Sequence, residues 1–190
     1  MLSGPSGVGK DVVLARMKEL GRPLHYTVTA TTRPQRGTER DGVDYHFLSP
    51  AKFEEMVAKG ELLEWAKVYG YWYGVPKEQV KQALEQGFDV IIKADVQGAA
   101  TIRRAAPQAL LIFLTPPSMA ELEARLRQRK TESGIDLNLR LKTAREETKC
   151  LPLFDYVVVN RQNQVDLAVA QIDAIISAEK CRVNPRVVEL

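Results

Sequence analysis

One short stretch decides how this chain folds: Gly4-Pro5-Ser6-Gly7-Val8-Gly9-Lys10. Its outer glycines, with four residues between them, and the lysine that follows match the G-x4-G-K pattern of a phosphate-binding loop. Glycines let successive backbone N–H groups point into one hollow, and the helix that follows adds the partial positive charge of its first turn. The lysine ammonium adds a full charge for the β- and γ-phosphates. We therefore predict that this stretch binds a nucleoside triphosphate.

The residue after the lysine departs from the usual pattern. A serine or threonine that holds Mg²⁺ is usual at this position, whereas this chain has Asp11. A carboxylate is a hard oxygen ligand, so Asp11 suits the ion, although it adds negative charge beside the phosphates. Only Met1–Ser3 precede the loop, so the strand expected there is either short or lacks residues at the recorded start.

Outward from the loop, strand and helix patterns alternate. Apolar or β-branched runs predict strands at residues 2–3, 27–30, 45–48, 61–68, 71–73, 88–94, 110–115 and 156–159. Helical patterns cover residues 10–20, 50 onwards, 76–87, 118 onwards and 164–178, with Ser49 and Ser118 as N-caps. This alternation predicts an α/β fold in which helices flank a parallel sheet. Short strands within residues 33–76 interrupt the alternation of strands and helices. They predict an inserted subdomain, with the core at residues 1–32 and 77–190.

Composition and charge are those of an ordinary globular protein. Hydrophobic residues make up 45% of the chain and the formal net charge is +3, which gives no sign of nucleic acid or a membrane as partner. Cys150 and Cys181 belong to no CxxC pattern, so we expect two reduced thiols. The chain shows no signal peptide and no apolar run of transmembrane length, which predicts a cytoplasmic protein. A monomer and a homodimer are both compatible with the sequence.

A dense polar stretch after residue 29 predicts a second pocket. Arg33 and Arg36 lie three residues apart in a loop, where two guanidinium groups can clamp one phosphate, and the Tyr45 hydroxyl is a further donor. A buried Glu64 would accept hydrogen bonds from the N1–H and exocyclic amine of guanine, a pair of donors that adenine lacks. Two other interpretations remain open: a solvated basic loop, and a different phosphate acceptor such as a ribose phosphate.

Together these motifs resemble those of the guanylate kinase family over nearly the whole chain. The matching pieces are Ser3-Gly-Pro-Ser-Gly-Val-Gly-Lys10, Thr31-Thr-Arg-Pro34, Arg36, Gly42-Val-Asp-Tyr45, Leu63-Glu-Trp-Ala66, Tyr73-Gly74 and Asp95-Val-Gln-Gly98. The resemblance implies a P-loop kinase that phosphorylates GMP and dGMP with ATP and Mg²⁺, a step of guanine nucleotide supply. It also implies a mixed-β insert that binds GMP at residues 33–76 and a helical lid at about residues 125–145.

The resemblance further implies roles for individual residues. It assigns the GMP phosphate to Thr29, Arg33, Arg36, Tyr45 and Tyr73. It assigns guanine to Glu64, the guanine or metal side to Asp95, and the adenine of ATP to Asn160. It favours as catalytic cations Lys10, Arg36, Arg125, Arg129 and Arg140. Arg125 and Arg129 share one helix face at i,i+4 spacing, and for any single lid arginine a solvated, charged helix face is the alternative.

The chain departs from the family pattern at three positions. Val75 lacks the hydroxyl that is usual near the base, Lys93 replaces the first acid of an Asp-x-Asp pair, and Asp11 replaces the loop hydroxyl. Because one negative charge is lost and one is gained, we hypothesise that Asp11 and Lys93 compensate each other. A binding module is the competing functional class, since guanylate-kinase-like domains of scaffold proteins lose ATP binding and recognise peptides. The intact loop glycines and Lys10 argue against it.

Overall fold

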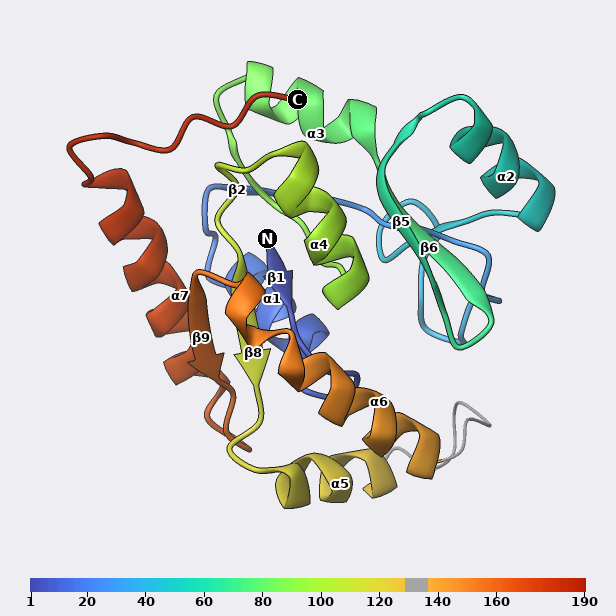
Figure 1. Ribbon diagram of the computed structural model, residues 1–190, viewed down its shortest axis with the longest axis vertical. Helices are drawn as coiled ribbons and strands as arrows, with labels where there is room; N and C mark the ends of the chain where they lie inside the picture. Colours follow the sequence, from blue (N-terminus) through green and yellow to red (C-terminus); the bar gives the residue numbers. More distant parts are fainter. Residues whose placement is uncertain (129–136) are drawn as a thin grey trace. The chain divides into compact units, whose positions relative to one another are not determined.

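The computed structural model describes residues 1–128 and 137–190, and Figure 1 shows the path of the chain. The chain forms two compact units. We call the first the loop unit; it contains Leu2–Arg22 and Gln108–Glu189. We call the second the middle unit; it contains Pro23–Pro107 together with the two terminal residues.

The loop unit is built on a parallel sheet with the strand order β1-β8-β9. β1 (Leu2–Ser3) pairs with β8 (Ile112–Thr115), and β8 pairs with β9 (Tyr156–Val159). The described helices of this unit are α1 (Lys10–Glu19), α5 (Met119–Gln128), α6 (Leu137–Lys149) and α7 (Val165–Lys180), with a 3-10 turn at Leu151–Leu153. Apolar runs predicted as buried strands supply the core, because Leu2, Phe113 and Leu114 are fully buried.

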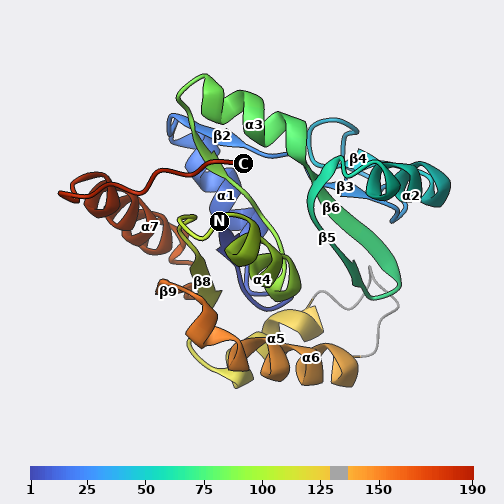
Figure 2. The ribbon, with the colours of Figure 1, turned by 45° about the horizontal axis from the view of Figure 1, so that its top comes forward.

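Helices α5 and α6 lie side by side in Figure 2. Their contact is apolar and is made by Leu122 and Leu126 from α5 and by Leu141 and Ala144 from α6. α1 packs against α7 elsewhere in the same unit. The helices that carry the predicted lid arginines are therefore anchored to each other by a small hydrophobic core.

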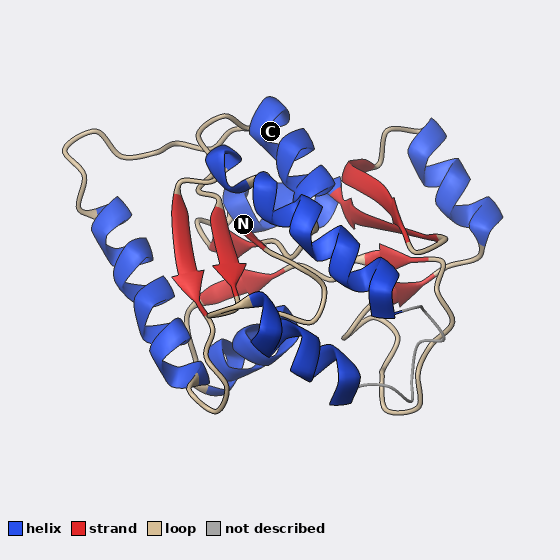
Figure 3. Cartoon of the chain, turned by 60° about the horizontal axis from the view of Figure 1, so that its bottom comes forward, coloured by secondary structure: helices blue, strands red, loops and turns tan. Residues whose placement is uncertain are grey.

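The middle unit contains two sheets, whose strands are red in Figure 3. β2 (Leu24–Tyr26) and β7 (Asp89–Ile91) form a parallel pair. A mixed sheet has the order β4-β3-β6-β5 and contains β3 (Ala30–Thr31), β4 (His46–Phe47), β5 (Leu62–Val68) and β6 (Tyr71–Pro76). The helices of this unit are α2 (Pro50–Ala58), α3 (Lys77–Glu85) and α4 (Val96–Ala105). The antiparallel pair β5–β6 carries Glu64 and Tyr73.

Parallel strands flanked by helices, with a separate mixed sheet, confirm the predicted α/β fold class. The predicted helix caps are also confirmed. Ser49 Oγ accepts a hydrogen bond from Lys52 N at 3.2 Å, and Ser118 Oγ accepts one from Glu121 N at 3.2 Å. Serine is favoured at these positions because its hydroxyl satisfies an amide that the helix itself leaves without a partner. The boundaries of the insert and of the lid stay predictions.

The strand predicted at residues 27–30 is wrong. The chain is extended in two shorter strands, β2 and β3, on either side of residues 27–29. Between them, the Gln79 side chain on α3 takes the place of a neighbouring strand. Val28 N donates to Gln79 Oε1 at 2.9 Å, and Gln79 Nε2 donates to Val28 O at 2.7 Å. One side-chain amide therefore satisfies both polar backbone groups of Val28.

The sequence patterns also miss α4, and α6 is foreseen only through the helical lid that the family resemblance implies at about residues 125–145. α4 follows Asp95, whose carboxylate accepts a hydrogen bond from Gly98 N at 2.8 Å and caps the helix. α6 is rich in charged residues and buries only Leu141 and Ala144. Two buried residues produce only a weak helical periodicity in the sequence. The helix is therefore stabilised mainly by tertiary contacts, which the sequence pattern does not reveal.

Within residues 1–128 and 137–190, no helix is long and apolar enough to cross a membrane. Cys150 is half-buried and Cys181 is exposed, and both are free thiols. The Cys150 thiol donates to Glu146 O at 3.8 Å, one helical turn earlier.

We expect Gln79→Ala to lower the free energy of unfolding by about 1–3 kcal/mol, because Val28 N–H and C=O lose their partner. Gln82→Ala, three residues further along α3, is the matched control. Its amide donates to exposed Glu78 on the surface, so a change below about 0.5 kcal/mol is expected. Urea denaturation followed by circular dichroism measures both values, and equal stability of the two variants would contradict the role given to Gln79.

Candidate functional site

At two glycines of the phosphate loop, the backbone lies too close to neighbouring atoms for a side chain to fit. Gly4 has a φ of +142°, and a Cβ on it would lie 2.1 Å from Leu114 O on β8. Gly9 has a φ of +101°, and its Cβ would lie 2.5 Å from Asn160 Nδ2. Left-handed backbone and close approach both require glycine. The motif glycines therefore determine the shape of the loop.

Lys10 and the helix that it opens supply positive charge to this loop. The Lys10 ammonium donates to Gly4 O, and also to Pro5 O at 3.3 Å, so the side chain folds back over the loop. α1 begins at Lys10, and Gly9 has no side chain to cap the first amides of the helix. Such amides attract anions. The predicted stretch from residue 4 to residue 10 thus forms one loop whose charge and helix amides suit an anion, and Asp11 is exposed in the first turn beside it.

The Val8 carbonyl joins two of the predicted residues to the loop. Asn160 Nδ2 donates to Val8 O at 2.8 Å, and Arg125 Nη1 donates to the same oxygen at 3.2 Å. Arg125 Nη2 donates to Asn160 O at 2.7 Å and pairs with Glu121. Asn160 is buried, and the Arg125 side chain is 11% exposed. Both residues hold the loop in shape, while their predicted contacts with adenine and with transferring phosphate stay predictions.

Helix α6 contacts the loop through two charged residues. Arg140 Nη2 donates to Ser6 Oγ at 3.1 Å, and Glu147 Oε2 accepts a hydrogen bond from Ser6 N at 3.4 Å. A loop amide therefore already donates to an anionic oxygen, which is the type of acceptor that a phosphate presents. Arg129, the other predicted lid arginine, lies outside the described residues.

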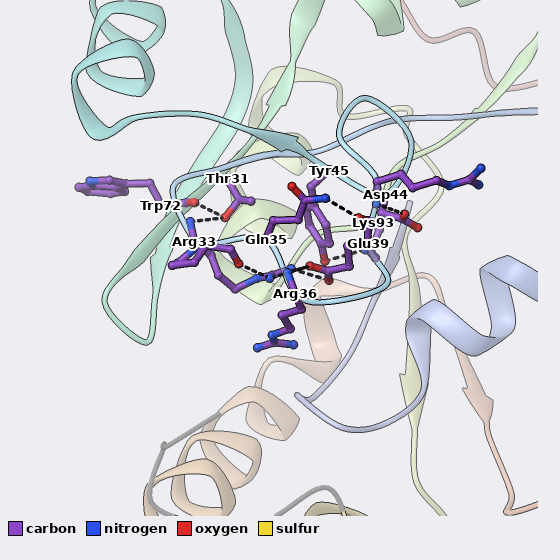
Figure 4. Close-up of polar contacts among 11 residues, drawn as sticks. Thr31, Arg33, Gln35, Arg36, Glu39, Asp44, Tyr45, Trp72 and Lys93 are labelled. Carbon is purple, nitrogen blue, oxygen red and sulfur yellow. Dashed lines mark hydrogen bonds and ion pairs between the residues drawn. The ribbon is translucent and has the colours of Figure 1, made fainter. Parts of the chain in front are cut away.

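In the middle unit, Arg33 forms a two-pronged ion pair with Glu39. Arg33 Nη1 donates to Glu39 Oε2 at 2.8 Å, and Nη2 donates to Oε1 at 2.7 Å (Figure 4). The Arg33 side chain is 7% exposed. Burial disfavours both charges, but the paired hydrogen bonds outweigh it, so the pKa of Arg33 is raised and the pKa of Glu39 is lowered. The charge of Arg33 is therefore largely balanced within the protein.

Arg36 meets the same carboxylate through its backbone. Arg36 N donates to Glu39 Oε2 at 2.9 Å, whereas the Arg36 side chain is exposed and points away from Glu39 in Figure 4. The loop between the two arginines thus turns around Glu39. A joint clamp of Arg33 and Arg36 on one phosphate stays a prediction.

The Tyr45 ring is in contact with Arg33, Lys93 and Tyr73. Arg33 Cζ lies 5.0 Å, and Lys93 Nζ 4.4 Å, from the centre of the Tyr45 ring. Lys93 Nζ also donates to the Tyr45 hydroxyl at 2.9 Å. The Tyr73 ring meets the Tyr45 ring edge to face, with 6.2 Å between centres, and burial raises the pKa of the Tyr73 hydroxyl. Thr29 Oγ1 is buried without a hydrogen-bond partner in the part of the chain that the structure describes.

Glu64 is a buried carboxyl group on β5. Its side chain packs against the start of α4, where a Cβ on Gly98 would lie 2.3 Å from Glu64 Oε2. Glu64 is 3% exposed, and burial, with a smaller contribution from the charge of Asp95, raises its pKa to about 8. Asp95 itself caps α4 through Gly98 N. The predicted guanine-reading residue is therefore a protonated acid at neutral pH, held in a dry environment.

Sequence reasoning does not predict the contacts of Glu39 with Arg33, of Glu147 with Ser6 or of Lys93 with Tyr45. Glu39 lies three residues after Arg36, a spacing that is compatible with a loop closed on a carboxylate. Glu147 carries no local signal, since only the folding of α6 brings it to Ser6. Lys93 contacts Tyr45 in its own unit, and its predicted compensation of Asp11, a residue of the other unit, stays a hypothesis.

Comparisons with known proteins extend over both units. The model of the guanylate kinase family matches residues 1–179. Guanylate kinase 2, chloroplastic/mitochondrial, of Oryza sativa subsp. japonica is 45% identical over 191 residues, which cover 100% of this chain and 67% of that protein. Guanylate kinase of Halalkalibacterium halodurans is 44% identical over 182 residues, with coverage of 96% and 88%. The crystal structure of guanylate kinase from Anaplasma phagocytophilum is 30% identical, covers 96% of this chain and 85% of that chain, and has a TM-score of 0.77.

We expect Gly9→Ala to destabilise the protein by about 1–3 kcal/mol, because φ is +101° and the added Cβ meets Asn160. Gly37→Ala is the matched control, since a Cβ at Gly37 meets nothing within 4 Å. It should leave stability within about 0.5 kcal/mol of the original protein. Thermal and urea denaturation measure both changes. A Gly9→Ala protein as stable as Gly37→Ala would show that the steric account of the loop is wrong.

The raised pKa of Glu64 predicts a pH-dependent stability. The folded protein keeps the proton up to a pH of about 8, whereas the unfolded chain releases it near 4.5, so the free energy of unfolding falls as pH rises between these values. Glu64→Gln cannot titrate and should gain stability over the original protein across this window, by roughly a few kcal/mol at its upper end. Urea denaturation of both proteins at several pH values measures the difference. A difference that does not change with pH would mean that Glu64 is ionised throughout.

Proposed function

Because the chain belongs to the guanylate kinase family, we propose which residues bind each substrate and which stabilise the transferring phosphate. The chain phosphorylates GMP to GDP with ATP as co-substrate. The observation that carries this conclusion is the family match over residues 1–179, which includes an unbroken G-x4-G-K loop. We extend the acceptor to dGMP, since the proposed contacts address the base and the phosphate rather than the ribose.

ATP would be bound by the loop of the loop unit. Its phosphates would accept hydrogen bonds from the amides of residues 4–10, and Lys10 would exchange the Gly4 and Pro5 carbonyls for phosphate oxygens. Asn160 would support the loop and contact adenine. Arg125, Arg129 and Arg140 would supply charge to the transferring phosphoryl group. The contacts of Arg125 with Val8 O and of Arg140 with Ser6 Oγ support this, because both arginines already touch the loop.

Mg²⁺ would arrive with ATP. Among residues 1–128 and 137–190, no group of three or more His, Cys, Asp and Glu side chains is arranged to hold a metal ion. The exposed Asp11 carboxylate in the first turn of α1 fits a single protein contact to an ion carried mainly by phosphate oxygens. The ion would neutralise charge between the β- and γ-phosphates.

GMP would be bound by the middle unit. Glu64 would release its proton when guanine binds and would accept the guanine N1–H and exocyclic N–H as a carboxylate. Asp95 lies close enough to raise its pKa in the unbound protein. Tyr73, Tyr45 and Thr29 would donate hydroxyl hydrogen bonds to the GMP phosphate. Buried Thr29 Oγ1 supports this role, since the described residues offer it no partner. Arg33 would add its charge from the face of the Tyr45 ring, and Arg36 would act from the exposed part of the loop.

The chemical step is a direct transfer. A GMP phosphate oxygen would attack the γ-phosphorus of ATP in line with the leaving oxygen, so that one O–P bond forms as the bond to ADP breaks. No covalent enzyme intermediate is required. The protein would supply position, charge neutralisation and exclusion of water, which otherwise would accept the phosphoryl group.

Two other functions make different predictions. A peptide-binding module would bind ligands without ATP turnover, and the intact loop glycines and Lys10 argue against it. A kinase with a ribose phosphate as acceptor would not need a buried carboxyl such as Glu64. The location in the cytoplasm and the choice between monomer and homodimer stay predictions.

A coupled assay of ADP formation tests the function. With ATP and Mg²⁺, we expect turnover of GMP and dGMP and little or none of AMP, CMP and UMP. Glu64→Gln should raise the KM for GMP by about 10-fold or more, because an amide accepts the two guanine donors less well. Glu61→Gln, an exposed neighbour before β5, should not change it. Unchanged GMP turnover by Glu64→Gln would favour a different acceptor, and ligand binding without turnover would favour a binding module.

A further inference from the structure

Glu121 makes a contact that its place in the sequence does not predict. It stands three residues after Ser118, and in such a capping box the glutamate side chain reaches back to the first amide of the helix. The serine half of the box is formed, because Glu121 N donates to Ser118 Oγ at 3.2 Å. The Glu121 carboxylate turns instead to Gln162 N, at 3.1 Å, and to Arg125. A tertiary contact therefore takes the place of a local one.

One oxygen of this carboxylate, Glu121 Oε1, holds the Arg125 guanidinium. Arg125 Nη2 pairs with it and also donates to Asn160 O at 2.7 Å. Arg125 Nη1 donates to Val8 O at 3.2 Å. Because Gln162 N donates to the same Glu121 oxygen, the backbone fixes the carboxylate, and the carboxylate in turn fixes the guanidinium.

The two carbonyls that Arg125 joins lie at the same edge of the parallel sheet. Val8 belongs to the loop that follows β1, and Asn160 follows β9 directly. β1, β8 and β9 are parallel, and β8 and β9 both run toward α5 in Figure 1. Ligands of α/β proteins bind at the carboxyl ends of such strands. A residue that holds the loop and the segment after β9 together therefore acts on the site proposed for ATP.

We propose that Glu121 is a positioning residue for ATP that acts through Arg125 on the phosphate loop. The proposal rests on the proposed function, in which this loop binds ATP. Arg125 keeps a donor for that substrate, because Nη1 carries two N–H groups and, among the described residues, uses one of them on Val8 O. Without Glu121 the long Arg125 side chain loses an anchor and regains rotamer freedom. The Val8 carbonyl and the second Nη1 N–H are then less well placed, so ATP binds less tightly.

The alternative is that Glu121 only strengthens helix α5, as i,i+4 pairs of opposite charge do. The same helix carries a second pair with this spacing, since Arg127 Nε and Nη2 donate to Glu123 Oε1 at 3.0 and 2.6 Å. That pair lies on the surface. Glu123→Ala is therefore the matched control for Glu121→Ala, because each removes one Glu–Arg pair from α5. Both variants keep the Ser118 cap, which uses the backbone N–H of residue 121.

The experiment measures ATP and GMP separately. Calorimetry with Mg²⁺ gives the affinity for each nucleotide alone, and steady-state assays give the two KM values. We expect Glu121→Ala to weaken ATP binding and to raise the KM for ATP by about 10-fold, with the KM for GMP changed by less than about 2-fold. Glu123→Ala should match the original protein.

A conservative variant separates the acceptor from the charge. Glu121→Gln keeps an oxygen that can accept from Arg125 and Gln162 but loses the negative charge, so it should show a smaller loss of ATP affinity, about 3-fold. It keeps the test decisive if the alanine variant folds poorly.

A double-mutant cycle tests the route from Glu121 to the loop. In the Arg125→Met background, Glu121→Ala should change the affinity for ATP by less than about 2-fold, since the guanidinium that it holds is already missing. An unreduced effect in that background would show that Glu121 acts by another route and would overturn the proposal.

Two further results would overturn it. Equal losses of ATP and GMP affinity would show that Glu121 only maintains the fold. Unchanged ATP binding by Glu121→Ala, or an equal loss in Glu123→Ala, would reduce the contact to stabilisation of α5. In each case phosphorylation of GMP by the original protein still stands. That function fails only if the original protein does not phosphorylate GMP, so the two failures are distinguishable.

Discussion

The close approach of the phosphate loop to β8 and to Asn160 is the constraint on which the loop unit depends. Gly4 and Gly9 lie at positive φ, with no room for a Cβ at either position. The Val8 carbonyl between them is held by Asn160 and Arg125. These contacts fix the direction of the loop amides before any phosphate is bound, and preorganised donors lose less entropy on binding than mobile ones.

The middle unit holds its charged and titratable groups in a partly buried environment. Arg33 and Glu39 neutralise each other through a bidentate pair, while Glu64 keeps its proton because burial disfavours its charge and Asp95 adds negative charge. A buried ion pair adds little net stability, since desolvation offsets the attraction. The Arg33–Glu39 pair therefore serves mainly to shape the loop from residue 33 to residue 39, with Arg36 N completing it. Both Arg33 and Lys93 lie over the Tyr45 ring, and Lys93 also donates to the Tyr45 hydroxyl.

Much of this arrangement follows from local patterns. The G-x4-G-K stretch identifies the loop, because few residue types permit that backbone, and the two serine caps mark helix starts through a local hydrogen bond. The strand expected at residues 27–30 is not formed as predicted, because its pairing is not determined by a local pattern. β-Branched residues favour an extended backbone but do not say what pairs with it, and at Val28 the partner is a side-chain amide from α3.

The sequence by itself determined the fold class and the phosphate loop, since each depends on residue type at fixed spacing, whereas the acceptor residues that the family resemblance implies stay predictions. Tertiary structure alone decided which charges meet. Glu39 balances Arg33, Glu147 reaches Ser6, and Lys93 donates to Tyr45 rather than merely replacing an acid. The physical reason is that electrostatic energy depends on distance and burial, and neither is encoded in the spacing of residues along the chain.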